Sequence, residues 1–169
     1  MDVWDAIQHK RAVRRFTDEP LPDAVVERIL RAGRRAQSSK NTQPWHFIAV
    51  RDRDILQKLS QTGRYLDHVA RAALCICIVL PDVAERARWI VFDAGQAAAY
   101  MQLSAVELDI GSVLGAIHQP DEARELLGFP PSYRCDALIS FGYPAPEERR
   151  PPRGAGRKPL DELVHWDRW

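Results

Sequence analysis

Four cationic side chains lie close together near the start of the chain, at Lys10, Arg11, Arg14 and Arg15. Such a cluster repels itself unless an anion compensates it. A phosphate is a suitable partner, because guanidinium forks and ammonium donors match its oxygen atoms. The segment therefore indicates a phosphate contact, and a solvated basic turn is the alternative that these residues alone leave open.

A second group of candidates follows at Ser38, Ser39 and Asn41, shortly before Trp45. Short hydroxyl and amide side chains on a loop can hydrogen-bond the edge of a planar heteroaromatic ring, while an aromatic side chain lines its pocket. The other interpretation is a polar connection that ends in a tryptophan packed into the core.

The C-terminal part holds a third group of cations. Arg149, Arg150 and Arg153 stand in a proline-rich stretch that continues to Arg157 and Lys158. One of them could close on the same phosphate, and a flexible basic tail is the alternative. The chain ends in Leu163-Val164-His165-Trp166, which is apolar enough to require burial.

Other chemical signals are weak. Cys75 and Cys77 stand two apart in a predicted strand, so their side chains share one face. They lack the spacing of a zinc knuckle, and the pattern favours inert buried thiols. The sequence has no G-x-S-x-G, no G-x-G-x-x-G after a strand and no P-loop, so a nucleophile elbow, a dinucleotide fold and a nucleotide triphosphate site are not supported.

The candidate side chains must be positioned by the helices and strands that the sequence predicts, and both types of element occur along the chain. Hydrophobic spacing predicts a long buried helix from Ala87 to Leu108, with Asp82 as its N-cap. Residues 74–80 form an almost continuous apolar run, which is typical of a central strand buried on both faces. The remaining predicted helices are 2–9, 22–36, 52–61, 65–72 and 120–127, the last stopped by Gly128, and two further strands are 46–50 and 137–141. Gly111 and Gly115 bracket residues 112–114, which form either a strand or a tight approach of the backbone.

Length and composition indicate one globular domain over residues 1–169, with about 144–169 as an extended C-terminal arm. The formal net charge of +1 gives no global attraction to nucleic acid or to acidic membranes. The long apolar stretch carries Arg88, Asp93 and Glu107, so it is a poor membrane span. Three cysteines and the N-terminal residues favour a reducing cytoplasm over a disulfide-bonded, secreted protein.

These segments together resemble the nitroreductase family of FMN-dependent oxidoreductases. The family patterns are R-R-S-x-R-x-F, A-P-S-x-x-N-x-Q-P-W and G-L-G-S-x-x-x-G. Here they are matched by residues 10–16 (KRAVRRF), 36–45 (AQSSKNTQPW) and 108–115 (LDIGSVLG), and the chain ends similarly with residues 141–144 (FGYP) and 157–160 (RKPL). The likeness covers nearly the whole chain, and the N-Q-P-W block is its most specific part.

The resemblance implies an α+β nitroreductase-like fold, a mostly antiparallel sheet flanked by helices, in an intertwined homodimer whose C-terminal segments are exchanged. That exchange would bury Val164 and Trp166. FMN is expected at the dimer interface, so that both chains contact it.

The resemblance also assigns roles by position. Lys10, Arg11 and Arg157 are expected at the FMN phosphate, Ala12 beside them, and Arg14 near the pyrimidine side of the ring. Gly111 and Ser112 are expected to approach the ring in the same subunit. Ser38, Ser39 and Asn41 are expected to come from the other subunit, with Trp45 in the substrate pocket. No metal is implied, and no catalytic side chain is needed because the cofactor carries the hydride chemistry.

Three positions depart from the family pattern. Ala12 stands where serine is usual and removes a phosphate hydroxyl, Lys10 replaces arginine, and Gln37 replaces proline in the loop. These departures bear on FMN affinity and redox tuning.

The leading hypothesis is an oxidoreductase that transfers a hydride from NAD(P)H, through FMN, to a nitroaromatic, a quinone or a similar acceptor by a ping-pong mechanism. A specialised flavin-modifying or narrow-substrate relative is the alternative, motivated by the short chain, which lacks a long insert to cover the pocket. A nucleic-acid-binding module built on the basic segments is the alternative from another class, and the near-neutral charge opposes it.

Overall fold

The computed structural model describes residues 1–149 and 156–169. Its centre is a four-stranded sheet in the order β1-β2-β4-β3, in which every neighbouring pair is antiparallel. The strands are β1 (His46–Val50), β2 (Leu74–Pro81), β3 (Gly111–Ala116) and β4 (Tyr133–Gly142). The mostly antiparallel sheet that the sequence predicted is therefore confirmed.

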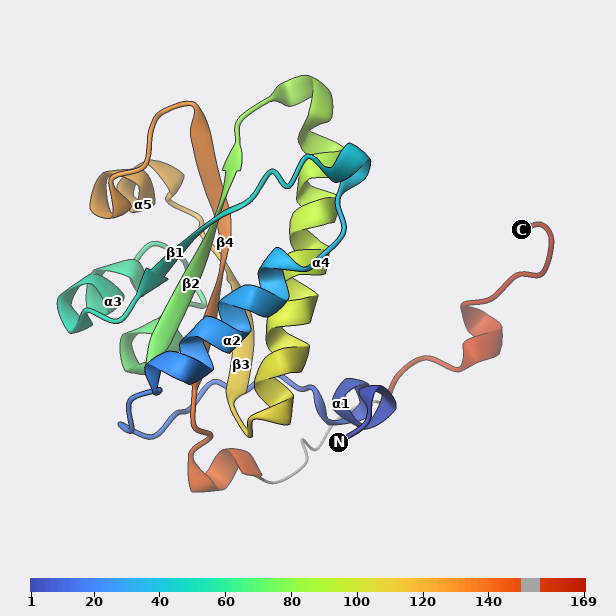
Figure 1. Ribbon diagram of the computed structural model, residues 1–169, viewed down its shortest axis with the longest axis horizontal. Coiled ribbons are helices and arrows are strands. Elements are labelled where there is room, and N and C mark those ends of the chain that lie inside the picture. Colours follow the sequence, from blue (N-terminus) through green and yellow to red (C-terminus); the bar gives the residue numbers. More distant parts are fainter. Residues whose placement is uncertain (150–155) are drawn as a thin grey trace.

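Helices cover both faces of this sheet (Figure 1). On one face α2 (Asp23–Arg34) packs on α4 (Ala87–Glu107), and on the other lie α3 (Arg53–Leu59) and α5 (Pro120–Leu127). Each face has its own apolar cluster, one around Ile76, Met101 and Phe141, the other around Leu56, Leu66 and Leu138. The central β2 supplies side chains to both clusters, which explains its continuous apolar run.

Local signals at the element ends agree with the sequence. α1 (Val3–His9) begins with a capping box, in which Asp2 accepts from the backbone of Asp5 and Asp5 accepts from that of Asp2. Asp52 caps α3 in a similar way, through the backbone nitrogens of residues 54 and 55. Gly128 ends α5 with φ +71°, a conformation that glycine adopts without strain.

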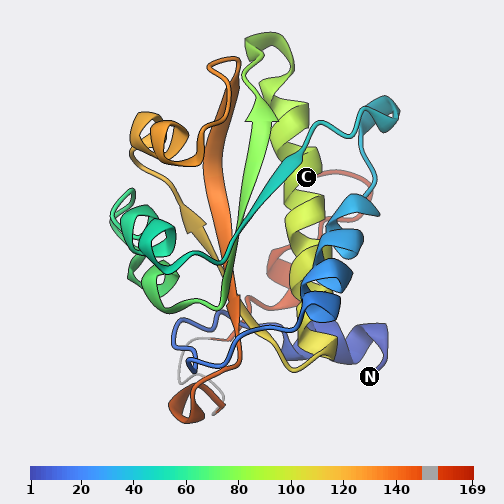
Figure 2. The same ribbon diagram turned by 60° about the vertical axis from the view of Figure 1, so that its left-hand side comes forward.

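The long helix departs from its prediction in two ways. It begins at Ala87 after a short 3₁₀ turn (Ala84–Arg86), so Asp82 is not its N-cap. Nor is it buried all round, because Trp89, Phe92 and Tyr100 are exposed in the single chain. Its apolar residues serve two faces, and only one of them packs on the sheet and α2 (Figure 2).

Smaller differences concern helix 65–72 and strand 137–141. Residues Asp67–Arg71 form a 3₁₀ helix instead of an α-helix, and β4 is twice as long as predicted because it starts at Tyr133. After the short 3₁₀ helix Pro146–Arg149, the described chain resumes at Gly156 and contains a last 3₁₀ turn, Leu160–Glu162. Within the described residues, no helix is both long and apolar enough to cross a lipid bilayer.

Candidate functional site

The basic segment after α1 lies along the start of β3. The backbone nitrogen of Val13 donates to the carbonyl of Ser112 at 3.0 Å, and Ala12 forms a parallel bridge with Ser112. The approach is close enough to require glycine at 111, because a Cβ there would stand 2.7 Å from Cγ1 of Val13. The glycine motif therefore serves to dock the cationic segment on the sheet.

Two of the predicted phosphate contacts, Lys10 and Arg157, come from opposite ends of the chain and are near enough for their charges to interact. Partial burial lowers the pKa of Lys10 below its ordinary value, and the nearby guanidinium of Arg157 lowers it further. The ammonium donates to the carbonyl of Arg11 at 3.2 Å. Among residues 1–149 and 156–169, neither Lys10 nor Arg157 forms an ion pair. Within the described residues, no ion pair therefore offsets the repulsion between these two cations.

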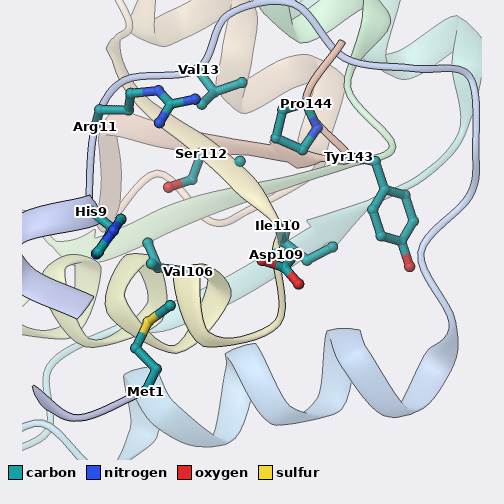
Figure 3. A pocket seen from close by; sticks show the side chains of 11 residues that line it. Met1, His9, Arg11, Val13, Val106, Asp109, Ile110, Ser112, Tyr143 and Pro144 are labelled. Carbon is teal, nitrogen blue, oxygen red and sulfur yellow. The ribbon is translucent and has the colours of Figure 1, made fainter. Parts of the chain in front are cut away.

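Arg11 faces a cavity of about 470 Å³ between the segment after α1 and the start of β3 (Figure 3). Ser112 and Gly111 line the same cavity from β3, and Tyr143 and Pro144 line it from the end of β4. Arg11 donates to the backbone carbonyl of Glu148, which ties the segment to the chain after β4.

Arg14, with Arg15 and Phe16 of the same segment, lines a second, larger cavity of about 700 Å³. The most buried polar residue of its lining is His68, which is hydrogen-bonded to Oγ of Ser140 at 2.9 Å. Burial, followed by the charge of Arg14, lowers the pKa of His68 to about 4, and Asp67 opposes the shift. His68 is therefore neutral near pH 7.

The Ser38–Asn41 loop lies at the other end of α4. The backbone nitrogen of Ser39 donates to the carboxylate of Asp93 at 2.9 Å, whereas the first cavity meets α4 at Val106. Thirteen residues of helix separate these points by roughly 20 Å, at about 1.5 Å per residue. Within one chain, the loop is not brought to the cations, so a shared site would need two chains.

The loop itself has an unusual backbone. Lys40, Asn41 and Gln43 have φ between 45° and 54°, the left-handed region that non-glycine residues rarely adopt. The hydroxyl of Ser38 accepts from the backbone nitrogen of Gln43 at 2.9 Å, and its proton is left to donate elsewhere. The buried Asp93 and this local bond hold a conformation that the sequence alone would disfavour.

The last sequence candidates lie in other surroundings. Trp45 is buried in the main apolar cluster, where its ring stacks on that of Phe47 at 6.4 Å. Its role in a substrate pocket stays a prediction. Arg150 and Arg153 lie outside the described residues, and so does the side chain of Arg149.

Two residues of structural weight were missed from the sequence, Asp93 and His68. The signal for Asp93 was a lone carboxylate on the buried stripe of an apolar helix, which requires a partner. His68 gave no comparable signal, because its burial depends on the contact between the Asp67–Arg71 turn and β4.

The cations and cavities fit FMN as a ligand. A phosphate dianion would compensate Lys10 and Arg157, and the larger cavity exceeds the smaller end of typical cofactor pockets. Ala12, in contrast, offers no hydroxyl at this point. The residues present therefore suit the phosphate by charge more than by neutral hydrogen bonds.

Comparison with known proteins identifies similar chains. A sequence model of the Nitroreductase family matches residues 7–74 and 57–143. A protein of Archaeoglobus fulgidus, named "Putative NADH dehydrogenase/NAD(P)H nitroreductase", is 36% identical over 84% of this chain and 85% of its own length.

Solved structures share the fold. An FMN-dependent nitroreductase from Clostridium difficile R20291 superposes with a TM-score of 0.83 at 28% identity, covering 97% of this chain and 98% of the other. The NADPH:FMN oxidoreductase of Vibrio harveyi, in complex with NAD⁺, has a TM-score of 0.89 at 23% identity, covering 99% of this chain and 77% of the other. The latter likeness concerns the fold alone.

Proposed function

The chain belongs to the nitroreductase family, and we propose that it is an NAD(P)H-dependent FMN oxidoreductase. The observation that carries this proposal is the docking of the cationic segment on β3, where Arg11, Gly111 and Ser112 line one cavity. The charge of Arg157 also acts on Lys10 there, and neither of these two cations forms an ion pair in the described residues. The similar FMN-dependent nitroreductase supports FMN as the ligand.

In this proposal the chain's residues bind and orient the cofactor. Lys10, Arg11 and Arg157 hold the phosphate, whose charge offsets their mutual repulsion. Arg14 places a positive charge at the pyrimidine side of the ring, where reduced flavin is negative, and so raises the reduction potential. Gly111 and Ser112 bring backbone close to the ring from β3, with Ala12 beside them.

FMN, when bound, accepts a hydride from the nicotinamide and passes two electrons on to the acceptor. For a nitroaromatic the balanced reaction is NAD(P)H + H⁺ + ArNO₂ → NAD(P)⁺ + ArNO + H₂O. Because the cofactor supplies this chemistry, no acid, base or nucleophile is required of the protein. The nicotinamide and the acceptor use the same face in turn, which is a ping-pong cycle.

We further propose that the site is completed by a second copy of the chain. Ser38, Ser39 and Asn41 of the partner subunit would reach the FMN, since the loop lies far from the cations within one chain. Apolar side chains exposed on α4 and the exposed Leu163 and Trp166 support an exchanged C-terminal arm. We also propose a cytoplasmic location, which the free, buried thiols of Cys75, Cys77 and Cys135 support.

The visible spectrum of the purified protein tests this function. We expect a flavin spectrum, release of FMN on denaturation, and anaerobic bleaching by NADH or NADPH followed by reoxidation with a nitroaromatic or a quinone. Protein that stays colourless after FMN is added would overturn the proposal. Bound FMN that neither nicotinamide reduces would instead favour the specialised flavin protein.

A further inference from the structure

The larger cavity, beside Arg14, is strongly cationic. Four guanidinium groups line it, against two carboxylates, and the histidine in its wall is neutral. One of the carboxylates, Glu147, stands 3.6 Å from Arg15. The lining thus carries a net positive charge that the proposed FMN phosphate, at Lys10 and Arg157, does not account for. Its charged residues are Arg14, Arg15, Arg64, Arg71, Asp67 and Glu147.

Arg64 and Tyr65 form the outer part of this cavity. The guanidinium carbon of Arg64 lies 5.3 Å from the centre of the Tyr65 ring, and both side chains are exposed. In the described part of the chain, Arg64 has no ion-pair partner. The pair therefore offers an aromatic face and an uncompensated charge at the same place.

The backbone beneath this pair is fixed. The nitrogen of Arg64 donates to Nδ1 of His118 at 3.0 Å, and the backbone of Thr62 accepts from the nitrogens of His118 and Gln119. Gly63 lies so close to the carbonyl of Ala116 that a Cβ there would stand 2.5 Å from it. The loop that carries Arg64 is thus anchored to the chain after β3, and the guanidinium projects from a defined position.

We propose that Arg64 selects acceptors whose aromatic ring carries a carboxylate or another anionic group. This inference rests on the proposed function, because it takes Arg14 to lie at the flavin. An acceptor in the same cavity would then have its reducible group near Arg14 and its far end near Arg64. A guanidinium binds a carboxylate in a bidentate manner, and Tyr65 gives the ring an aromatic surface to pack on.

The reaction on such an acceptor balances as in the neutral case. The nitro group of 4-nitrobenzoate takes two electrons and two protons, one of them with the hydride equivalent, and loses water to give 4-nitrosobenzoate. The carboxylate is unchanged throughout. Arg64 therefore acts on binding and position, and the electrons come from NAD(P)H.

The test compares 4-nitrobenzoate with 4-nitrobenzamide, a neutral acceptor of nearly the same shape. The ratio of their kcat/KM values is measured for the FMN-loaded wild-type protein, Arg64→Gln and Arg64→Lys. Intrinsic reactivity cancels because each variant meets the same pair. We expect Arg64→Gln to lower the nitrobenzoate to nitrobenzamide ratio about tenfold, the size expected for one charged hydrogen-bonding contact.

Two controls separate binding from general charge. Arg64→Lys should retain part of the ratio, since it keeps the charge and loses the fork. Arg31→Gln removes an exposed arginine on α2, outside the cavity, and should leave the ratio unchanged. In the wild type, high salt should lower the ratio by screening the contact.

An equal ratio in the wild type and Arg64→Gln would overturn this inference, as would an Arg64→Gln variant whose only defect is weaker FMN binding. Failure of the proposed function looks different. In that case the wild type binds no FMN, or neither NADH nor NADPH reduces it anaerobically, before any acceptor is added.

Discussion

The candidate site consists mainly of charged side chains, and Lys10 is the most informative of them. Its pKa is lowered by burial and by Arg157. In the protein without FMN, the charged Lys10 therefore lowers the free energy of unfolding. This destabilisation is complete below the lowered pKa and disappears as pH rises to the pKa of an unfolded lysine. A charged residue that destabilises the folded protein in this way is typical of a ligand-binding site.

Lys10→Gln should consequently separate stability from binding. We expect an unchanged or higher Tm for the protein without FMN at pH 7, and about tenfold or greater loss of FMN affinity, since hydrogen bonds to charged groups contribute roughly 1.5–3 kcal/mol. Thermal unfolding and fluorescence titration with FMN measure the two effects. Lys58→Gln, on the exposed side of α3, should change neither. Equal FMN affinity in Lys10→Gln and the wild type would contradict the phosphate role.

His68 predicts a pH dependence of stability. Its folded pKa of about 4 lies below the unfolded value near 6.5, so the unfolded chain binds more protons between these limits. Stability is therefore complete above pH 7 and falls as pH drops towards 4. Between pH 7 and pH 5 the loss should be about 2 kcal/mol, by the linkage relation.

Urea unfolding at several pH values, compared with His68→Gln, measures this loss. The difference in unfolding free energy between the wild type and the variant should shrink by that amount from pH 7 to pH 5. His46→Gln, at an exposed histidine of β1, should follow the wild type. A constant difference across this range would show that His68 titrates normally.

At the scale of helices and strands, the ends of some elements could be predicted from the sequence and others could not. Gly128 located the end of α5 from the sequence, because a turn residue acts within a few residues of itself. The predicted helices 2–9 and 52–61 begin at Asp2 and Asp52, which the structure shows to cap α1 and α3. The predicted N-cap of α4 was wrong, because Val83, in an extended conformation, and the turn Ala84–Arg86 separate Asp82 from the helix. Local capping rules hold only where the following backbone is already helical.

The candidate site shows the same limit. The family pattern selected Lys10 and Arg157, whose charges act on each other, but periodicity could not show that Asp93 reaches the Ser39 backbone. That contact joins residues 54 apart and depends on the packing of the loop over α4. The role of Asp93 can therefore be recognised only once the packing of the loop against α4 is known.

We expect the carboxylate of Asp93 to hold the Ser38–Asn41 loop in its conformation, through its hydrogen bond with the backbone nitrogen of Ser39. Asp93→Ala removes the acceptor of the Ser39 nitrogen, so we expect the left-handed residues of the loop to relax and FMN affinity to fall about tenfold. Unfolding free energy should fall by about 1–3 kcal/mol, as for other unsatisfied buried groups. Asp93→Asn keeps an acceptor oxygen and should bind FMN within about threefold of the wild type. FMN affinity equal to the wild type's in Asp93→Ala would refute this role.

At the scale of the whole molecule, α4 presents apolar side chains that no other element in the described part of the chain covers. Trp89 and Phe92 are 58% and 60% exposed, their rings meet edge to face at 6.1 Å, and Tyr100 follows on the same side at helical spacing. A sequence pattern cannot distinguish burial within a chain from burial between chains, which is why α4 was predicted simply as a buried helix. A contiguous surface of this kind usually marks an interface.

Phe92→Glu tests whether that surface joins two copies of the chain. A carboxylate in an apolar interface should weaken association by more than about 2 kcal/mol, so analytical ultracentrifugation should show a shift from dimer to monomer. FMN affinity should fall with it, because the Ser38–Asn41 loop would no longer meet the cations of a second chain. Gln57→Glu adds the same charge on α3, on the opposite face of the sheet, and should leave both properties unchanged. A monomeric Phe92→Glu that binds FMN as tightly as the wild type would refute the shared site, since one chain would then hold every contact that the cofactor needs.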